Sequence, residues 1–460
     1  MATLIEQKPL YNALPVGQDV IFTVSNTSVV STFTSVKFIA EVHISSTFAP
    51  NPNTSTDIVG TFKTTPNNAG VGMFDFRPII ESFVNADNLA RQGSAYKGTV
   101  NTSSSNVPMH LIDKYSGNVN SMRYLFIRFQ IEYIDAGNLV TTGIEDSELY
   151  QLFNGYLKYT DVLDLVGVDF GYNISNFNLS STTDSFLSNA PITQYANIND
   201  YGSLPFLAPN DNLSYIRLLY KDSTGTQIGT ENINRLTVNG AYDSYNGYIG
   251  MNLLYFGCFP ANLQNWSTMF QALVTAGTIQ GGSIVIQAFD NDPDRISQQY
   301  IINLNCPTLK GYEPIRLTWL NQWGVWDYYT FTMKSSKTIS TKGSTYQQLA
   351  GSWNESTYRI DSFKGGKKSF RVNATEKITM NTDFVNESES EWFEELINSP
   401  EVYILKGYED VVETSSALNQ YVTPVRLTTS NYTKKTVAND KLMQYTFEVE
   451  KSKTLRTQAV

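Results

Sequence analysis

Side chains that usually carry catalysis are rare in this 460-residue chain, which has two histidines, His43 and His110, and two cysteines, Cys258 and Cys306. We expect His43 on the polar face of a strand and His110 in a loop. A metal site or a nucleophilic triad needs several such groups together, and neither histidine has a second histidine or a cysteine nearby. The sequence therefore predicts no catalytic, metal or cofactor site.

The cysteines lie too far apart to form a disulfide framework. Cys258 stands in an apolar run and is predicted to be a buried thiol. Cys306 precedes Pro307 and is expected to be buried too. A bond between the two cysteines is the less favoured alternative.

Two acidic clusters are also candidates for calcium binding or acid–base catalysis. Residues 290–294, Asp-Asn-Asp-Pro-Asp, resemble the start of a calcium loop but lack its Gly at position six and Glu at position twelve. We interpret them as an acidic turn, with calcium as the alternative. The carboxylates at 387–395 fall in the first turns of a predicted helix, where negative charge complements the helix dipole. This placement favours a structural role over acid–base catalysis.

Aromatic and basic groups suggest two possible binding surfaces. Trp319, Trp323 and Trp326 could form a platform for stacking sugars, but only Trp323, at a turn, is expected at the surface. Tyr residues at 242, 245 and 248 are further candidates. The basic run 364–368, Lys-Gly-Gly-Lys-Lys, is predicted to be a hairpin tip and not a nucleic-acid patch.

Composition points away from several classes of protein. The net charge is −10 and the pI is about 4.9, whereas nucleic-acid-binding proteins usually carry basic patches. No apolar run is long enough for a membrane span or a signal peptide. Charged residues make up only 17%, below the usual quarter or so, and Asn, Ser and Thr replace them. We therefore expect neither a nucleic-acid nor a membrane partner.

Short alternating runs separated by polar turns predict a mainly β chain of several β-sandwich-like modules. We expect an N-terminal arm (1–15), a β-sandwich (16–145), a long linking excursion (146–205), a second β module (206–305) and a C-terminal β module (306–455). The aromatic hairpin 316–331 should form the core of the last module. A helix at 388–398, with a capping box at Ser388 and Glu391, should cover it.

The order of several motifs resembles that of structural virion proteins of tailed phages infecting Bacteroidota, including crAss-like phages. The matching pieces are Phe74-Asp75-Phe76, the run 186–191 (Phe-Leu-Ser-Asn-Ala-Pro), the 316–331 hairpin, the helix segment from Glu391-Trp392 to Val402-Tyr403, and Asn439-Asp440-Lys441-Leu442 with Tyr445. They touch most of the chain sparsely, and each is a packing or turn motif. The resemblance implies a tail or neck part of ring type with a tail-tube-like last module, and no catalytic residues.

We therefore predict a ring, collar or tail-hub subunit that assembles with copies of itself and with other tail or neck proteins. It would be made in the host bacterial cytoplasm and end up in the virion. Residues 1–15 and 171–200 are expected to bury surface only in the assembled particle. The alternative is a glycan-binding surface protein, such as a receptor-recognition or adhesin-like module.

Overall fold

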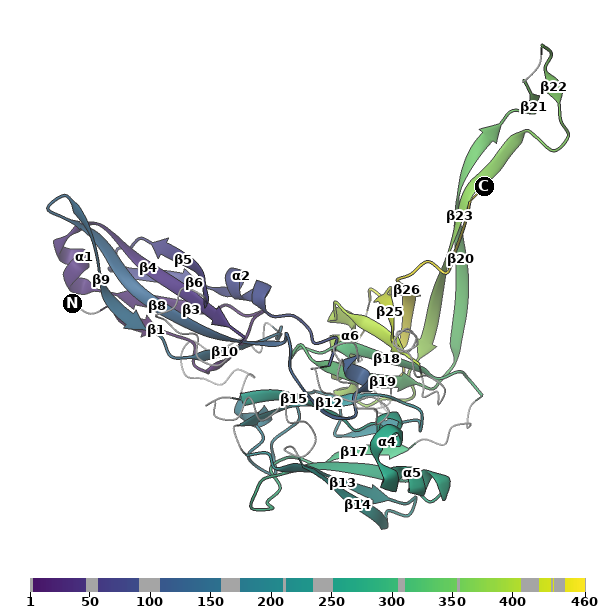
Figure 1. Cartoon of the computed structure of the whole chain (residues 1–460), viewed down its shortest axis with the longest axis horizontal. Coiled ribbons are helices and arrows are strands. Elements are labelled where there is room, and N and C mark those ends of the chain that lie inside the picture. Colours follow the sequence, from purple (N-terminus) through teal and green to yellow (C-terminus); the bar gives the residue numbers. More distant parts are fainter. Residues whose placement is uncertain are drawn as a thin grey trace. The chain divides into compact units, whose positions relative to one another are not determined.

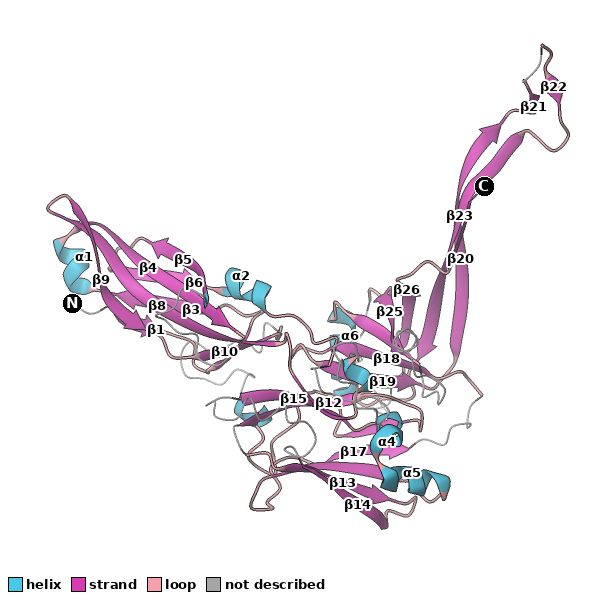
Figure 2. Cartoon of the chain, in the orientation of Figure 1, coloured by secondary structure: helices cyan, strands magenta, loops and turns pink. Residues whose placement is uncertain are grey.

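A computed structural model describes residues 3–46, 57–90, 108–158, 174–209, 212–234, 251–304, 311–353, 356–406, 422–431, 433 and 443–459. The prediction of a mainly β chain is confirmed, because 50% of it is strand, arranged in several sheets (Figure 2). The chain divides into two compact units. Unit 1 holds Met1–Cys306 and Leu320–Asp327, and unit 2 holds Pro307–Trp319 and Tyr328–Val460.

The first part of unit 1 is a β-sandwich built of two sheets over one core. One sheet has the order β1-β3-β6 and the other β2-β10-β8-β4-β5, with β9 also paired to β8. Phe22 of the first sheet packs on Phe129 and Tyr150 of the second. The strands are β1 (Leu4–Gln7), β2 (Ala13–Pro15), β3 (Ile21–Ser25), β4 (Thr34–Ser45), β5 (Ile58–Thr64), β6 (Val71–Asp75), β8 (Met122–Asp135), β9 (Asn138–Asp146) and β10 (Tyr150–Phe153).

Short helices connect the sandwich strands where local sequence favours them. Asn26 caps α1 (Thr27–Thr32) by accepting a hydrogen bond from the Val29 N–H. Pro78 lies in the first turn of α2 (Arg77–Ile80), where its missing N–H costs nothing, and η2 (Glu81–Phe83) follows directly.

The predicted N-terminal arm is wrong. Residues 4–7 form a strand antiparallel to β3, and residues 13–15 pair in parallel with β10. Ala13 and Leu14 are buried in the sandwich core. The segment is short, and its apolar residues are too few to show a period, so only the distant strands that it joins reveal its role.

The second part of unit 1 contains a five-stranded sheet, β11-β17-β16-β13-β14, and a three-stranded sheet, β12-β15-β7. Its strands are β7 (Lys114–Gly117), β11 (Thr193–Ala196), β12 (Ser203–Pro209), β13 (Tyr215–Lys221), β14 (Gln227–Asn234), β15 (Met251–Gly257), β16 (Ser283–Phe289) and β17 (Tyr300–Leu304). Its helices are η4 (Met109–Leu111), η6 (Ile174–Phe177), α4 (Pro260–Trp266) and α5 (Thr268–Thr275).

Two predicted boundaries in unit 1 need correction. The sandwich does not run continuously to residue 145, because β7 pairs with β15 in the second part. Residues 146–205 are not a linking excursion, since β10 completes the sandwich and β11 pairs with β17. The expectation that 171–200 stays uncovered in the single chain is also wrong where the segment is described, because Leu179, Phe186 and Leu187 are buried.

Unit 2 is built on one eight-stranded sheet with the order β19-β18-β24-β25-β26-β23-β20, to which β27 adds by pairing with β23. Its elements are β18 (Ile315–Leu320), β19 (Trp326–Phe331), β20 (Ser335–Gln348), β21 (Gly351–Ser352), β22 (Arg359–Ile360), β23 (Gly366–Asn381), α6 (Glu387–Asn398), β24 (Val402–Leu405), β25 (Val422–Leu427), β26 (Thr446–Lys451) and β27 (Arg456–Ala459). Strands β21 and β22 form a separate two-stranded sheet.

Helix α6 covers the aromatic core of unit 2, as predicted. Trp392 and Phe393 on the helix pack on Trp319, with ring centroids 4.9 and 6.3 Å apart. The capping box, however, is formed by Asn386 and Glu389. The Asn386 side chain accepts from the Glu389 N–H at 2.9 Å, and the Glu389 carboxylate accepts from the Asn386 N–H at 2.8 Å. The helix therefore begins before Ser388.

The aromatic hairpin is not wholly a core element of the last module. Its turn, Leu320–Asp327, belongs to unit 1. There Trp326 donates its indole N–H to the Asp87 carbonyl at 2.8 Å. Gly324 lies against the Asn154 carbonyl, where a Cβ would come within 1.6 Å of the oxygen, so only glycine fits.

Candidate assembly surface

The largest exposed feature of unit 2 is a two-stranded ribbon formed by β20 and β23, which we call the arm (residues 335–381). The strands pair antiparallel from Ser335↔Met380 to Gln348↔Gly366, with one irregularity between Ser344 and Thr345. The arm leaves the sheet as a long ribbon (Figure 1). Fourteen residues of β20, at about 3.4 Å each, give a length on the order of 45 Å.

The stem of the arm is mostly polar on both faces, and Ile339 and Phe370 are its exposed apolar residues. Nearly every residue of β20 is exposed, as are most residues of β23 before Val372. Lys337 and Lys342 lie on β20, a strand at the edge of the sheet, where lysines discourage uncontrolled strand pairing. Two-stranded hairpins are marginally stable alone, so the base of β23 gains support from β26 and β27.

The end of the arm carries a cluster of exposed apolar side chains, which we call the tip cluster. Strands β21 and β22 pair there, with Gly351 opposite Ile360. The tip cluster consists of Leu349 (71% exposed), Trp353 (78%), Tyr358 (48%), Ile360 (78%) and Phe363 (72%). Side chains of this size present an apolar area on the order of several hundred Å², the size at which an exposed patch usually marks an interaction site.

Polar contacts hold the backbone beneath the tip cluster in place. Asp361 accepts a hydrogen bond from the Ser352 hydroxyl at 2.6 Å and forms an ion pair with Lys364 at 3.1 Å. The Ser352 hydroxyl and the Lys364 ammonium together lower the pKa of the Asp361 carboxyl. Lys368 donates to the Phe363 carbonyl at 2.6 Å. The apolar side chains are thus displayed on an ordered support, which reduces the entropy lost when a partner covers them.

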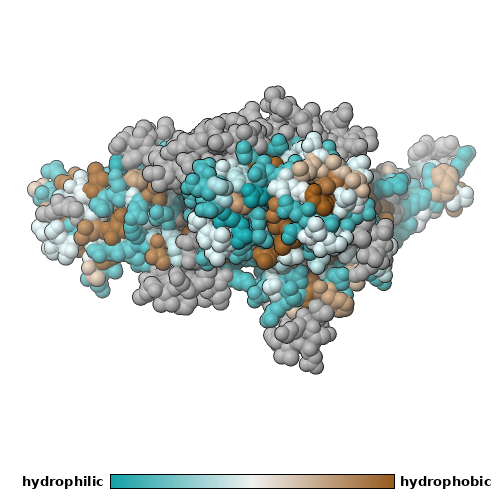
Figure 3. All heavy atoms as spheres, turned by 90° about the horizontal axis from the view of Figure 1, so that it is seen from below, coloured by the Kyte–Doolittle hydropathy of each residue, from teal (hydrophilic) through white to brown (hydrophobic). Residues whose placement is uncertain are grey.

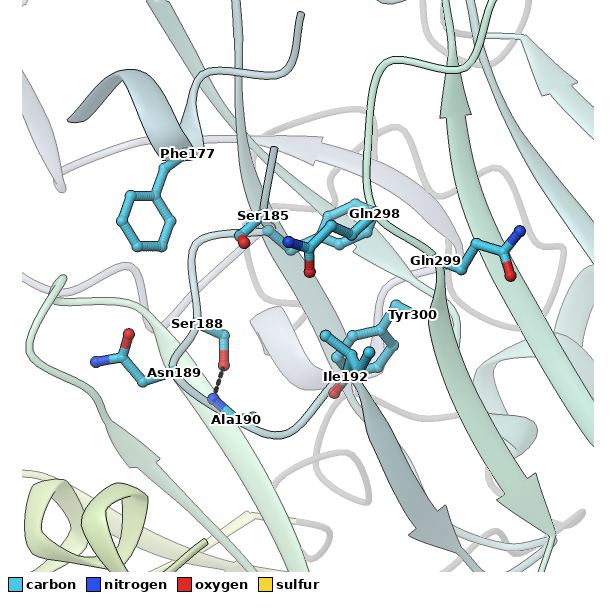
Figure 4. Close-up of a pocket in the computed structure, with 10 residues that line it drawn as sticks. Phe177, Ser185, Ser188, Asn189, Ala190, Ile192, Gln298, Gln299 and Tyr300 are labelled. Atoms are coloured by element: carbon cyan, nitrogen blue, oxygen red, sulfur yellow. Dashed lines mark hydrogen bonds between the residues drawn. The ribbon is translucent and has the colours of Figure 1, made fainter. Parts of the chain in front are cut away.

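Unit 1 contains a small cavity of about 220 Å³. Phe177 and Tyr300 supply aromatic rings, and Ser188, Asn189 and Gln298 supply hydroxyl and amide groups between them (Figure 4). The Ser188 hydroxyl is already engaged, because it donates to Asp327 and accepts from the Ala190 N–H. No residue that lines the cavity carries a charge.

The two histidines lie in the core and not where the sequence placed them. His43 was expected on a polar face but is fully buried. It contacts the Glu41 carboxylate at 2.8 Å and the Phe126 ring. His110 lies in the short helix η4, also buried, with its ring edge against Trp326.

The acidic clusters have structural partners of their own. Asp290 accepts from the backbone N–H groups of Asp292 and Asp294 at 3.0 and 2.8 Å, which confirms an acidic turn after β16. Glu389 belongs to the capping box of α6. Within the ranges that the structure describes, no three His, Cys, Asp or Glu residues lie close enough together to hold a metal ion.

The expectation that Trp323 lies at the surface, as a candidate for sugar stacking, is wrong. The side chain is only 4% exposed, because Phe153 and Phe177, far away in the sequence, pack on its ring at 6.2 and 4.5 Å. Trp319 is buried, as predicted. Cys258 is also buried as predicted. Cys306 and the tyrosines at 242, 245 and 248 lie outside the described residues.

The predicted hairpin tip at 364–368 is misplaced, because Lys367 and Lys368 already pair with Gln347 and Tyr346 inside the ribbon, and the tip lies before them, at 349–363. The backbone at Gly365 and Gly366 has φ of +102° and +75°, which favours glycine, and β23 begins there. Strand β20 has no apolar face, so the sequence shows no period there. The cluster of large apolar residues between 349 and 363 in a polar stretch was the available signal.

Comparison with known proteins gives no family. No family model and no curated protein matches the chain. One solved structure, the native conformation of E. coli alpha-2-macroglobulin, aligns at 8% identity with a TM-score of 0.18, over 83% of this chain and 22% of that one. A likeness this weak carries no argument. Among the described helices, none is both long and apolar enough to cross a membrane.

Proposed function

We propose that this chain is a structural, non-catalytic subunit of a tailed-phage virion. It would form part of a ring, collar or tail hub, and would assemble with copies of itself and with other tail or neck proteins. The host bacterial cytoplasm would be the place of assembly. The order of motifs, which resembles that of virion proteins of phages infecting Bacteroidota, supports this class.

The single observation that carries the proposal is the arm with its tip cluster. On the face drawn in Figure 3, hydrophobic residues form separate patches among hydrophilic ones. At the arm tip, by contrast, four side chains more than 70% exposed stand within 15 residues of one another. Water-exposed apolar surface of this kind is stabilised when a partner covers it. An extended, ordered arm that needs a partner is what an assembly subunit requires.

Quantitative mass spectrometry of purified virions tests the proposal. The protein should be present at a fixed number of copies per particle relative to the portal and major capsid proteins. It should also remain with the tail fraction when heads and tails are separated. A protein that is abundant in infected cells but absent from washed particles would overturn the proposal.

The cavity in unit 1 supports a second candidate function, glycan recognition at the host surface. Aromatic rings that stack on a sugar and neutral amides that bind its hydroxyls are suitable groups for a saccharide. A glycan array probed with the whole protein should then show binding that Phe177→Ala abolishes. The exposed Phe384→Ala variant, outside the cavity, should retain binding. An array with no bound glycan would rule this candidate out.

A further inference from the structure

We infer that the binding partner of the arm is a second copy of this chain, and that the arm docks on unit 1 of that copy. This inference rests on the proposed function and deepens it, because it names the partner and the surface. Charge, the distribution of apolar residues along the arm, and the apolar surface of unit 1 each support it.

Charge separates the arm from unit 1. Residues 335–381 contain eight Lys and Arg and three Asp and Glu, for a net charge of +5. Unit 1 contains 14 Lys and Arg and 26 Asp and Glu, for a net charge of −12. Opposite charge on two surfaces steers their encounter and fixes which surfaces meet. The chain therefore supplies both a basic arm and a unit of opposite net charge.

The apolar residues of the arm indicate a partner that covers more than its end. Besides the tip cluster, Ile339 and Phe370 on the stem are 61% and 55% exposed. Ile339 pairs with Glu376, near the base of the arm. A lipid surface that receives the tip would leave Ile339 uncovered. Aliphatic tip residues such as Leu349 and Ile360 offer nucleic acid no stacking surface. An extended protein surface fits the whole arm.

Unit 1 offers apolar side chains that could meet those of the arm. On the β8–β9 hairpin, Leu139 and Ile144 are 66% and 58% exposed. On the edge strand β11, Tyr195 is 60% exposed, and Ile192 just before it is 55% exposed. An interface that combines apolar anchors with surrounding opposite charges has the usual anatomy of a specific contact between proteins.

A contact between the arm of one copy and unit 1 of another is head-to-tail. Such a contact joins two different surfaces, so each copy donates one arm and receives one. Repetition closes a ring where the rotation allows it. A copy that has lost its tip cluster can still receive an arm but cannot donate one, and it therefore ends a growing chain.

Native mass spectrometry and sedimentation velocity of the full chain test this inference. The wild type should form oligomers whose mean size falls as salt rises from about 0.1 to about 1 M, because the Debye length shortens from roughly 10 to 3 Å. The variants W353S/I360S/F363S and K367E/K368E should associate at least about tenfold more weakly. The control K406E/K453E makes the same charge change at exposed lysines of unit 2 outside the arm and should associate like the wild type.

Mixing the wild type with the tip variant distinguishes a second copy of the chain from other binding partners. Adding excess W353S/I360S/F363S to the wild type should shorten the oligomers in proportion to its fraction. Wild type that is monomeric at all concentrations, or whose oligomers ignore the tip substitutions, would overturn the inference. Binding of the monomer through its tip to phosphatidylglycerol vesicles or to DNA would also overturn it. Fixed copy number in virions would leave the proposed function standing in each of these cases.

Discussion

At the scale of single residues, burial gives ordinary side chains structural roles that their sequence context does not reveal. Asp87 is fully buried and accepts hydrogen bonds from three successive backbone N–H groups, those of Val119, Asn120 and Ser121. The hydroxyls of Ser121 and Tyr255 also donate to it. One carboxyl group thus ties together segments distant in the sequence. Burial nevertheless raises its pKa, against the opposing effect of these hydrogen bonds.

Replacing Asp87 should therefore reduce stability in a way that depends on pH. Asp87→Ala leaves three backbone N–H groups and two hydroxyls without their acceptor and should cost about 2–3 kcal/mol. Asp87→Asn keeps an oxygen for them and should cost less. The unfolding midpoint in urea, followed by Trp fluorescence, provides the measurement. A loss in Asp87→Ala no larger than in Asp87→Asn would contradict this role.

The sign of the pH effect follows from the raised pKa of Asp87. The folded state holds the proton more tightly than the unfolded state, so the contribution of Asp87 to stability is largest below the unfolded pKa. It declines as the pH rises through the raised folded pKa. The stability of the wild type relative to Asp87→Asn should decline in that window. The Thr224 hydroxyl and the amides of the turn lower the pKa of Asp222. The stability of the wild type relative to Asp222→Asn should therefore show the opposite trend and fall as the pH falls.

Several residue-level predictions failed for one reason. Trp323 follows a turn signal and His43 alternates with apolar neighbours, so the sequence places both at the surface. Phe177 covers Trp323 from 146 positions away, and His43 lies in a central strand. Local patterns describe which residues share a face, but not which distant segment covers that face. Where hydrogen bonds between neighbouring residues determine the structure, as at the Asp290 turn, the prediction was right.

At the scale of elements, helix α6 shows how a predicted element depends on a few buried rings. Its apolar stripe of Trp392, Phe393 and Leu396 was visible in the sequence, and all three residues are buried. Trp392→Ala removes the ring that packs on Trp319 and should destabilise unit 2 by about 3–5 kcal/mol. The exposed neighbour Glu391→Ala should change stability by less than about 0.5 kcal/mol. Equal unfolding midpoints for the two variants would refute this account.

Strand β20 shows which kind of element cannot be predicted from the sequence pattern. Strands such as β4 and β8 can be recognised in a sequence because one face is buried and apolar residues alternate along them. Both faces of β20 are in water, so its composition of Ser, Thr, Lys and Gln carries no period. Its pairing with β23 is set by the tip turn and by the sheet at its base. A pattern based on burial cannot detect an element that is not buried.

At the scale of the whole molecule, the proposed role of the arm in assembly does not depend on the stability of the folded core. Its apolar tip cluster is exposed in the single chain, so it adds nothing to the core of unit 2. Retaining such a surface lowers solubility and raises the risk of aggregation. The simplest physical reason to keep it is a contact made after folding. The arm and the core should therefore respond independently to mutation.

Shortening the arm tests this independence directly. Ser344 lies opposite Arg371, so residues 345–370 can be replaced by Asn-Gly, a two-residue turn that suits antiparallel strands. The pairing of β27 with Arg371–Ala374 is kept. Because the removed side chains are largely exposed, the unfolding midpoint of the shortened chain should match that of the wild type, while its incorporation into particles should be lost. A shortened chain that unfolds more easily would make the arm part of the fold, and one that still enters particles would remove its role in assembly.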